Sequence, residues 1–189
     1  MSFLSPQSYR LNKNDIFIIA IAILAVVLRL LPHLPNIAPI GALFVVSGLI
    51  AVKKSRLIIP LLALLISDIF TGFYSPLVMT SVYLGFLIMA AIGYFFKKHQ
   101  NALSAVMSSL AGSLSFFLLT NFAVWAFTPM YEKNLIGLFE SYFMAAPFFR
   151  NSLIGDLGYV ILFWFAYKLV IQRKNIKVLS KTADFKLIS

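Results

Sequence analysis

Leu77–Phe96 reads LVMTSVYLGFLIMAAIGYFF, a run of 20 residues with no charged side chain. An α-helix of this length rises about 30 Å, which matches the hydrocarbon thickness of a lipid bilayer. Five other apolar stretches resemble it, although several are shorter than an ideal membrane span. They cover Ile16–Leu31, Ala38–Val52, Leu57–Thr71, Leu103–Phe127 and Ser152–Ile171. The sequence therefore predicts an all-α integral membrane bundle of about six transmembrane helices.

The composition argues against a soluble domain. Of the 189 residues, 61% are hydrophobic and only 12% are charged, whereas soluble domains carry about a quarter charged residues. The net charge of +10 does not indicate nucleic-acid binding, because the Lys and Arg residues stand in short clusters between apolar stretches. The absence of cysteine excludes disulfides, thiolate metal sites and cysteine nucleophiles.

The connections between the apolar stretches alternate between basic and neutral. Residues 53–56 and 97–99 are basic, whereas residues 32–36 and 72–76 contain no Lys or Arg. Because cytoplasmic loops are enriched in Lys and Arg, we expect both ends of the chain in the cytoplasm. The predicted organisation is a cytoplasmic segment (1–15), a six-helix membrane domain (16–171) and a basic cytoplasmic tail (172–189). The first apolar run is read as a membrane helix rather than as a signal peptide, because no small-residue cleavage site follows it.

The longest connection, residues 128–149, is amphipathic. Ile136, Phe139 and Phe143 recur at near-helical spacing among polar residues. We expect an element on the outer side of the membrane, separate from the last span, that serves either as an interfacial helix or as a lid over a ligand.

A set of polar residues is predicted to share one layer in the outer half of the membrane. Charged groups at this depth are costly, so each needs a reason to be there. Counting the 1.5 Å helical rise along each stretch gives Arg29, Asp68 and Asp156 similar heights. By the same counting the layer also includes His33, Asn36, Tyr83, Asn121, Trp125, Glu140, Arg150 and Asn151.

This layer predicts a polar pocket with aromatic walls that opens to the outside and takes a small organic ligand. The alternative is that Arg29 pairs with Asp68 or Asp156 only to hold helices together. No catalytic motif is present, so an enzyme is not expected. An enzyme acting on lipid headgroups with His33, Asp68 and Asp156 as acid and base is a weaker alternative.

Several short motifs in order carry a family resemblance. They are Arg29-Leu-Leu-Pro32-His33-Leu-Pro35-Asn36, Ser67-Asp68, Thr120-Asn121-Phe122 and Phe148-Phe149-Arg150-Asn151-Ser-Leu-Ile-Gly155-Asp156. The chain resembles the S-components of energy-coupling-factor vitamin transporters. It is most similar to a group of small six-helix proteins related to the solitary cobalamin S-components of Gram-negative bacteria.

The resemblance implies a substrate-binding component for uptake of a vitamin or a related molecule, in the bacterial cytoplasmic membrane. It implies that His33, Asp68, Tyr83 and Arg150 line the pocket, with Asn36, Asn121, Asn151 and Asp156 as neighbours. The cobalamin-specific proteins ligate cobalt with a cysteine, which this chain lacks. If the ligand is a corrinoid, His33 is the expected cobalt contact; otherwise we expect no metal and no cofactor.

The expected partners are membrane lipids, the vitamin-like ligand and an energy-coupling module of a transmembrane subunit with ATPases. The Ala-x-x-x-Ala face by which S-components dock on that subunit is missing from the first helix, where Ala20, Ala22 and Ala25 have other spacings. A solitary mode of action is thus equally open. A structural or assembly subunit of the membrane remains the alternative outside transport.

Overall fold

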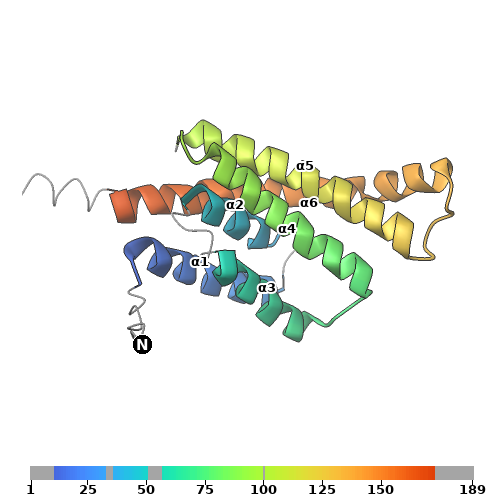
Figure 1. Ribbon diagram of the computed structural model, residues 1–189, viewed down its shortest axis with the longest axis horizontal. Coiled ribbons are helices and arrows are strands. Elements are labelled where there is room, and N and C mark those ends of the chain that lie inside the picture. The colour runs from blue at the N-terminus through green and yellow to red at the C-terminus, as the bar shows by residue number, and fades with distance from the viewer. Residues whose placement is uncertain (1–10, 33–35, 51–56, 100, 173–189) are drawn as a thin grey trace, which may run out of the picture.

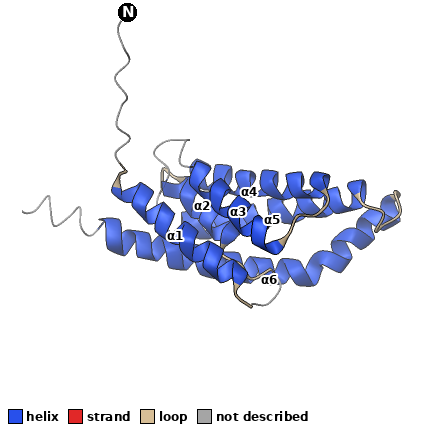
Figure 2. Ribbon diagram, turned by 90° about the horizontal axis from the view of Figure 1, so that it is seen from below, coloured by secondary structure: helices blue, strands red, loops and turns tan. Residues whose placement is uncertain are grey.

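The computed structural model describes residues 11–32, 36–50, 57–99 and 101–172. Over these residues the chain is helical, with no strand, so the prediction of an all-α fold is confirmed for them (Figures 1 and 2). The helices are α1 (Lys13–Leu30), α2 (Ile40–Ile50), α3 (Ile58–Thr71), α4 (Pro76–Phe96), α5 (Ala102–Phe127) and α6 (Leu135–Tyr167), followed by a π-helical turn, η2 (Lys168–Gln172). Most of the predicted cytoplasmic segment and all but the first residue of the tail lie outside the described residues.

Asparagine side chains fix the starts of three helices. The Asn12 side chain accepts a hydrogen bond from the Asp15 amide, and the Asp15 carboxylate accepts one from the Asn12 amide, each at 3.0 Å. This reciprocal capping box starts α1 at Lys13, three residues before the predicted start at Ile16. Asn101 and Asn134 cap α5 and α6 without the reciprocal bond, each accepting from a backbone amide three residues on.

The short helix α2 lies at the centre of the fold, and all of its residues from Ile40 to Ile50 are buried. Two glycines let its backbone touch that of α4. A Cβ atom on Gly48 would overlap the carbonyl oxygen of Ala90, and one on Gly93 would overlap that of Val45. Small residues at such crossings allow the close helix packing that stabilises bundles in lipid.

The other helices are arranged around α2 in a defined order. In Figure 1, α1 and α3 lie together on one side and α5 lies on the other, with α2 and α4 between them. The last helix, α6, packs along α5 and α2, and its C-terminal end reaches α1, where the rings of Phe17 and Tyr167 are 5.4 Å apart. The far ends of α5 and α6 form a hairpin that extends beyond the remaining helices. The bundle therefore has one end at which α5 and α6 overhang the ends of α1, α2 and α4.

The last helix differs from the sequence prediction. Residues 128–149 were expected to form an element separate from a span beginning at Ser152, but α6 begins at Leu135 and runs without a break to Tyr167. Pro147 lies inside it, and Figure 2 shows α6 bending along its course. An internal proline removes one amide donor and crowds the preceding turn, which bends a helix without necessarily ending it.

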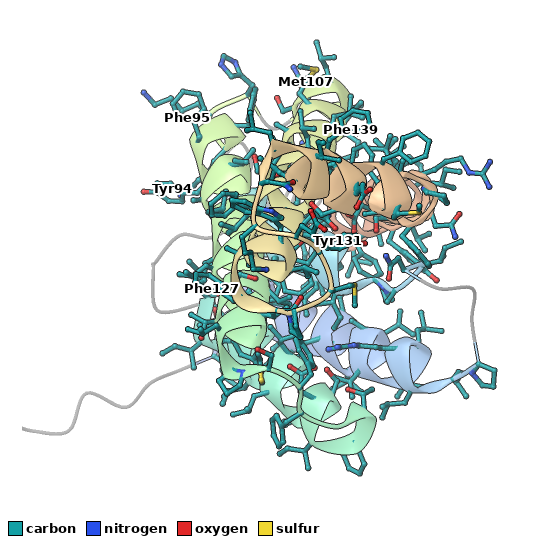
Figure 3. The ribbon with its side chains drawn as sticks, turned by 90° about the vertical axis from the view of Figure 1, so that its right-hand side faces the viewer. Tyr94, Phe95, Met107, Phe127, Tyr131 and Phe139 are labelled. Carbon is teal, nitrogen blue, oxygen red and sulfur yellow. The ribbon has the colours of Figure 1, made fainter. Side chains whose placement is uncertain are left out.

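Large apolar side chains cover the outside of the bundle. Phe95 is 81% exposed and Leu135 is 84% exposed, and Figure 3 shows Tyr94 and Phe95 pointing away from the helices. Among the described residues, three helical segments are long and apolar enough to cross a membrane, namely Pro76–Phe96, Ala102–Phe127 and Leu135–Ile171. An apolar exterior on such helices is typical of a protein whose solvent is lipid.

Candidate functional site

A cavity of about 460 Å³ lies where the C-terminal end of α1 meets the first turn of α2 and the middle parts of α4, α5 and α6. Residues from all five helices and from the segment before α2 form its wall. Its volume falls within the range of cavities that hold small organic ligands, roughly 300–1,000 Å³. The overhanging halves of α5 and α6 continue beyond it (Figure 1).

Phenylalanine rings form the apolar part of the wall. Phe86 of α4 and Phe116 of α5 lie with ring centroids 4.6 Å apart, and Phe117 stacks on Phe149 of α6 at 4.4 Å. Gly85 makes room for one of these rings, since a Cβ atom there would lie 2.7 Å from Phe116 Cδ2. The rings are thus held by contacts between helices and offer a preformed apolar surface.

Asp156 is the buried acid of the cavity. Its side chain projects from α6, and the residue is only 8% exposed. Ser113 Oγ on α5 donates a hydrogen bond to Asp156 Oδ2 at 2.7 Å. Gly41 in the first turn of α2 touches the same carboxyl group, because a Cβ atom at Gly41 would overlap Asp156 Oδ1. Three helices therefore fix the position of this group.

Arg29 closes the cavity at the end of α1 and belongs to a polar network behind the wall. Its Nη2 lies 2.7 Å from Asp68 Oδ1, and its Nη1 donates to Ser67 Oγ at 2.6 Å. Tyr83 Oη on α4 donates to Asp68 Oδ2 at 2.8 Å. The Asp68 side chain is 2% exposed and that of Arg29 is 21% exposed. The network joins α1, α3 and α4 and balances the charge of Arg29.

The structure brings four of the sequence-predicted site residues to the cavity wall. These are Arg29, Asn36, Asn121 and Asp156. Asn36 has a φ of +62°, a left-handed conformation that asparagine tolerates better than most residues. Asp68 and Tyr83 lie behind the wall. Asp68 pairs with the wall residue Arg29, and Tyr83 donates a hydrogen bond to Asp68.

The other predicted residues lie elsewhere among the described residues, or outside them. Trp125 lies near the C-terminal end of α5, where its Nε1 donates at 2.9 Å to the carbonyl oxygen of Glu132 in the connection to α6. Glu140 and Arg150 are exposed on α6, and Asn151 is half-buried beside the cavity without lining it. His33 falls outside the described residues.

Several wall residues were not predicted from the sequence. Ser113 and Ser152 are polar wall residues, and Gly41 provides the close approach to Asp156. The spacing of Ser152 and Asp156, four residues apart on one helix, is a signal that could have linked these two. Ser113 carries no comparable signal, because small residues recur throughout α5.

The comparisons with known proteins give one match. No curated protein and no solved structure is similar to the chain. The sequence model of one family, described as a family of unknown function (DUF6580), matches residues 10–179. This match covers most of the 189 residues, and the chain therefore belongs to the family of unknown function DUF6580.

Proposed function

We propose that this protein is a substrate-binding component for uptake of a vitamin-sized molecule across the bacterial cytoplasmic membrane. All six helices span or enter the membrane, both chain ends face the cytoplasm, and the cavity faces the outside. The ligand enters from the outer side, and delivery inward uses either an energy-coupling module or a movement of the protein on its own. The resemblance to S-components of energy-coupling-factor transporters motivates this proposal.

The cavity is the observation that carries the proposal. It combines a phenylalanine wall with Arg29, Asn121 and Asp156 at fixed positions, which is the mixture of apolar surface and few polar groups that ligand sites use. It lies near the C-terminal end of α1, which is the outer end if the N-terminus is cytoplasmic. Both features support capture of a ligand from outside.

The size of the cavity favours a ligand smaller than a corrinoid. About 460 Å³ accommodates a molecule with one or two rings, whereas a corrin macrocycle with its side arms is larger than such ligands. The chain also has no cysteine to ligate cobalt. We therefore place a vitamin or vitamin precursor of modest size ahead of cobalamin.

The alternative of a structural or assembly subunit is favoured by a different observation. Arg29, Asp68 and Tyr83 satisfy one another, as expected of groups that only hold helices together. This alternative predicts that changes to the cavity wall leave uptake of every molecule unaffected.

The test fills the cavity without touching the network. Ser152→Phe places a ring at the cavity wall, and Ile154→Phe places the same ring on the exposed face of the same helix. Cells that depend on the protein are tested for uptake of a panel of labelled vitamins and precursors. We expect Ser152→Phe to abolish uptake of one of them and Ile154→Phe to leave it intact. Equal uptake by both variants for every compound would rule out the proposal.

A further inference from the structure

Asp156 is a buried acid without a cationic partner among the described residues. Its Oδ2 accepts from Ser113, and no described group donates a hydrogen bond to its Oδ1. A buried carboxylate is costly unless a cation or several donors compensate it. Asp156 also lines the cavity, so a group that enters the cavity is able to supply the missing compensation.

The positive charges near the cavity do not balance Asp156. Arg29 lines the cavity but forms its ion pair with Asp68. The N-terminus of α2 approaches Asp156 at Gly41, and a helix N-terminus offsets about half a charge. With Asp156 ionised, the cavity and its immediate surroundings therefore have a net negative charge.

Other polar wall groups on α5 have already used donor hydrogens within their own helix. Asn121 Nδ2 donates to the carbonyl oxygen of Phe117 at 2.8 Å, and Thr120 Oγ1 donates to that of Phe116 at 2.9 Å. The Ser113 hydroxyl donates to Asp156. What these side chains still offer is mainly acceptor capacity, because the hydroxyl and amide oxygens keep their lone pairs, while Asn121 Nδ2 keeps one further N–H. A ligand rich in N–H groups fits such a wall.

The phenylalanine rings of the wall also favour a positively charged ligand. Aromatic faces attract cations, and the attraction is largest where water is excluded. Phe86, Phe116, Phe117 and Phe149 all line the cavity that holds Asp156.

We propose that the ligand of this cavity is a small organic cation with N–H groups, whose positively charged nitrogen binds Asp156 Oδ1. The ammonium of a primary amine and a protonated amino-heterocycle belong to this class. The inference rests on the proposed function, since it assumes that the cavity holds a ligand, and it specifies the charge of that ligand.

The experiment uses the full chain purified in detergent. Binding is measured by native mass spectrometry and isothermal titration against cationic thiamine and pyridoxamine, neutral pyridoxine and riboflavin, anionic pantothenate, biotin and nicotinate, and cobinamide. Pyridoxamine and pyridoxine form a matched pair, because an amine in the first replaces a hydroxyl in the second. We expect a cation to bind and its affinity to fall about 10- to 100-fold in Asp156→Asn. Glu132→Gln, which removes an exposed carboxylate distant from the cavity, should leave affinity unchanged.

The outcomes separate the two proposals. Tight binding of a neutral or anionic compound, or binding of pyridoxamine and pyridoxine with equal measurable affinity, would overturn the inference and leave the proposed ligand cavity standing. Binding of a cation that is unaffected by Asp156→Asn would also overturn it. Binding of none of the compounds would count against both proposals. If Asp156→Asn fails to fold, the comparison of the cationic compounds with the neutral and anionic ones on the unaltered protein still decides.

Discussion

At the scale of single residues, Asp68 receives two strong interactions at once. Arg29 pairs with one carboxylate oxygen and Tyr83 donates to the other. Because Asp68 is almost fully buried, each lost partner leaves part of its charge unsolvated. The cost of an unsatisfied buried group is about 1–3 kcal/mol, and breaking a buried ion pair costs about 3–5 kcal/mol.

We therefore expect Tyr83→Phe to lower the free energy of unfolding by about 1–3 kcal/mol, and Arg29→Gln to lower it by about 3 kcal/mol. Thermal and denaturant unfolding of the detergent-purified protein measures both. Tyr94→Phe is the control, since Tyr94 is an exposed tyrosine near the far end of the same helix. A loss with Tyr94→Phe as large as that with Tyr83→Phe would show that the Asp68 network does not stabilise the fold.

Counting along the helices gave Arg29, Asp68 and Asp156 a common height, but it did not give the direction of their side chains. It also wrongly included Trp125 and Glu140, which lie toward the overhanging end of α5 and α6. The 1.5 Å rise per residue gave Arg29, Asp68 and Asp156 one layer, and the structure places Arg29 beside Asp68 and Asp156 at the same cavity. The direction of a side chain around its helix depends on which neighbours pack there. Arg150 is exposed for this reason. Ser113 joins Asp156 from another helix with no sign of it in the sequence.

At the scale of helices, the crossing of α2 and α4 depends on two glycines. Glycine at a helix interior normally lowers helix stability by about 1 kcal/mol relative to alanine. At Gly48 the opposite holds, because a Cβ atom would overlap the backbone of α4 at Ala90. An overpacked contact of this kind costs about 1–3 kcal/mol or more.

Gly48→Ala is thus expected to lower the unfolding temperature and the yield of folded protein. Gly158→Ala is the matched control, because nothing lies within 4 Å of a Cβ atom there, and it should leave stability unchanged or raise it slightly. Unfolding followed by circular dichroism compares the two variants. If Gly48→Ala were as stable as Gly158→Ala, α2 and α4 would not be in the close contact described at Gly48.

Helix boundaries were less predictable than helix positions. The hydrophobic pattern located each of the six helices because apolar length is a strong signal. It missed the continuity of α6 across Pro147, since a proline marks a probable end and only the packing decides between an end and a bend. The pattern also predicted a second helix four residues longer than the 11 residues of α2. Two of those four, residues 51 and 52, lie outside the described part of the chain.

At the scale of the whole molecule, the proposed function requires a fixed orientation in the membrane. The connection between α5 and α6 must face outward for the cavity to receive a ligand from outside, and the connection between α4 and α5 must face the cytoplasm. The basic residues support this orientation, because Lys97 and Lys98 follow α4 and cytoplasmic loops retain Lys and Arg.

The absence of cysteine makes this orientation directly measurable. Met130→Cys and His99→Cys each introduce a single thiol at an exposed position in one of the two connections. In intact spheroplasts we expect a membrane-impermeant maleimide to label Met130→Cys and to leave His99→Cys unlabelled until the cells are lysed. Labelling of His99→Cys alone would invert the orientation, place the cavity on the cytoplasmic side and make uptake from outside untenable, whereas export or a purely structural role would then fit the same fold.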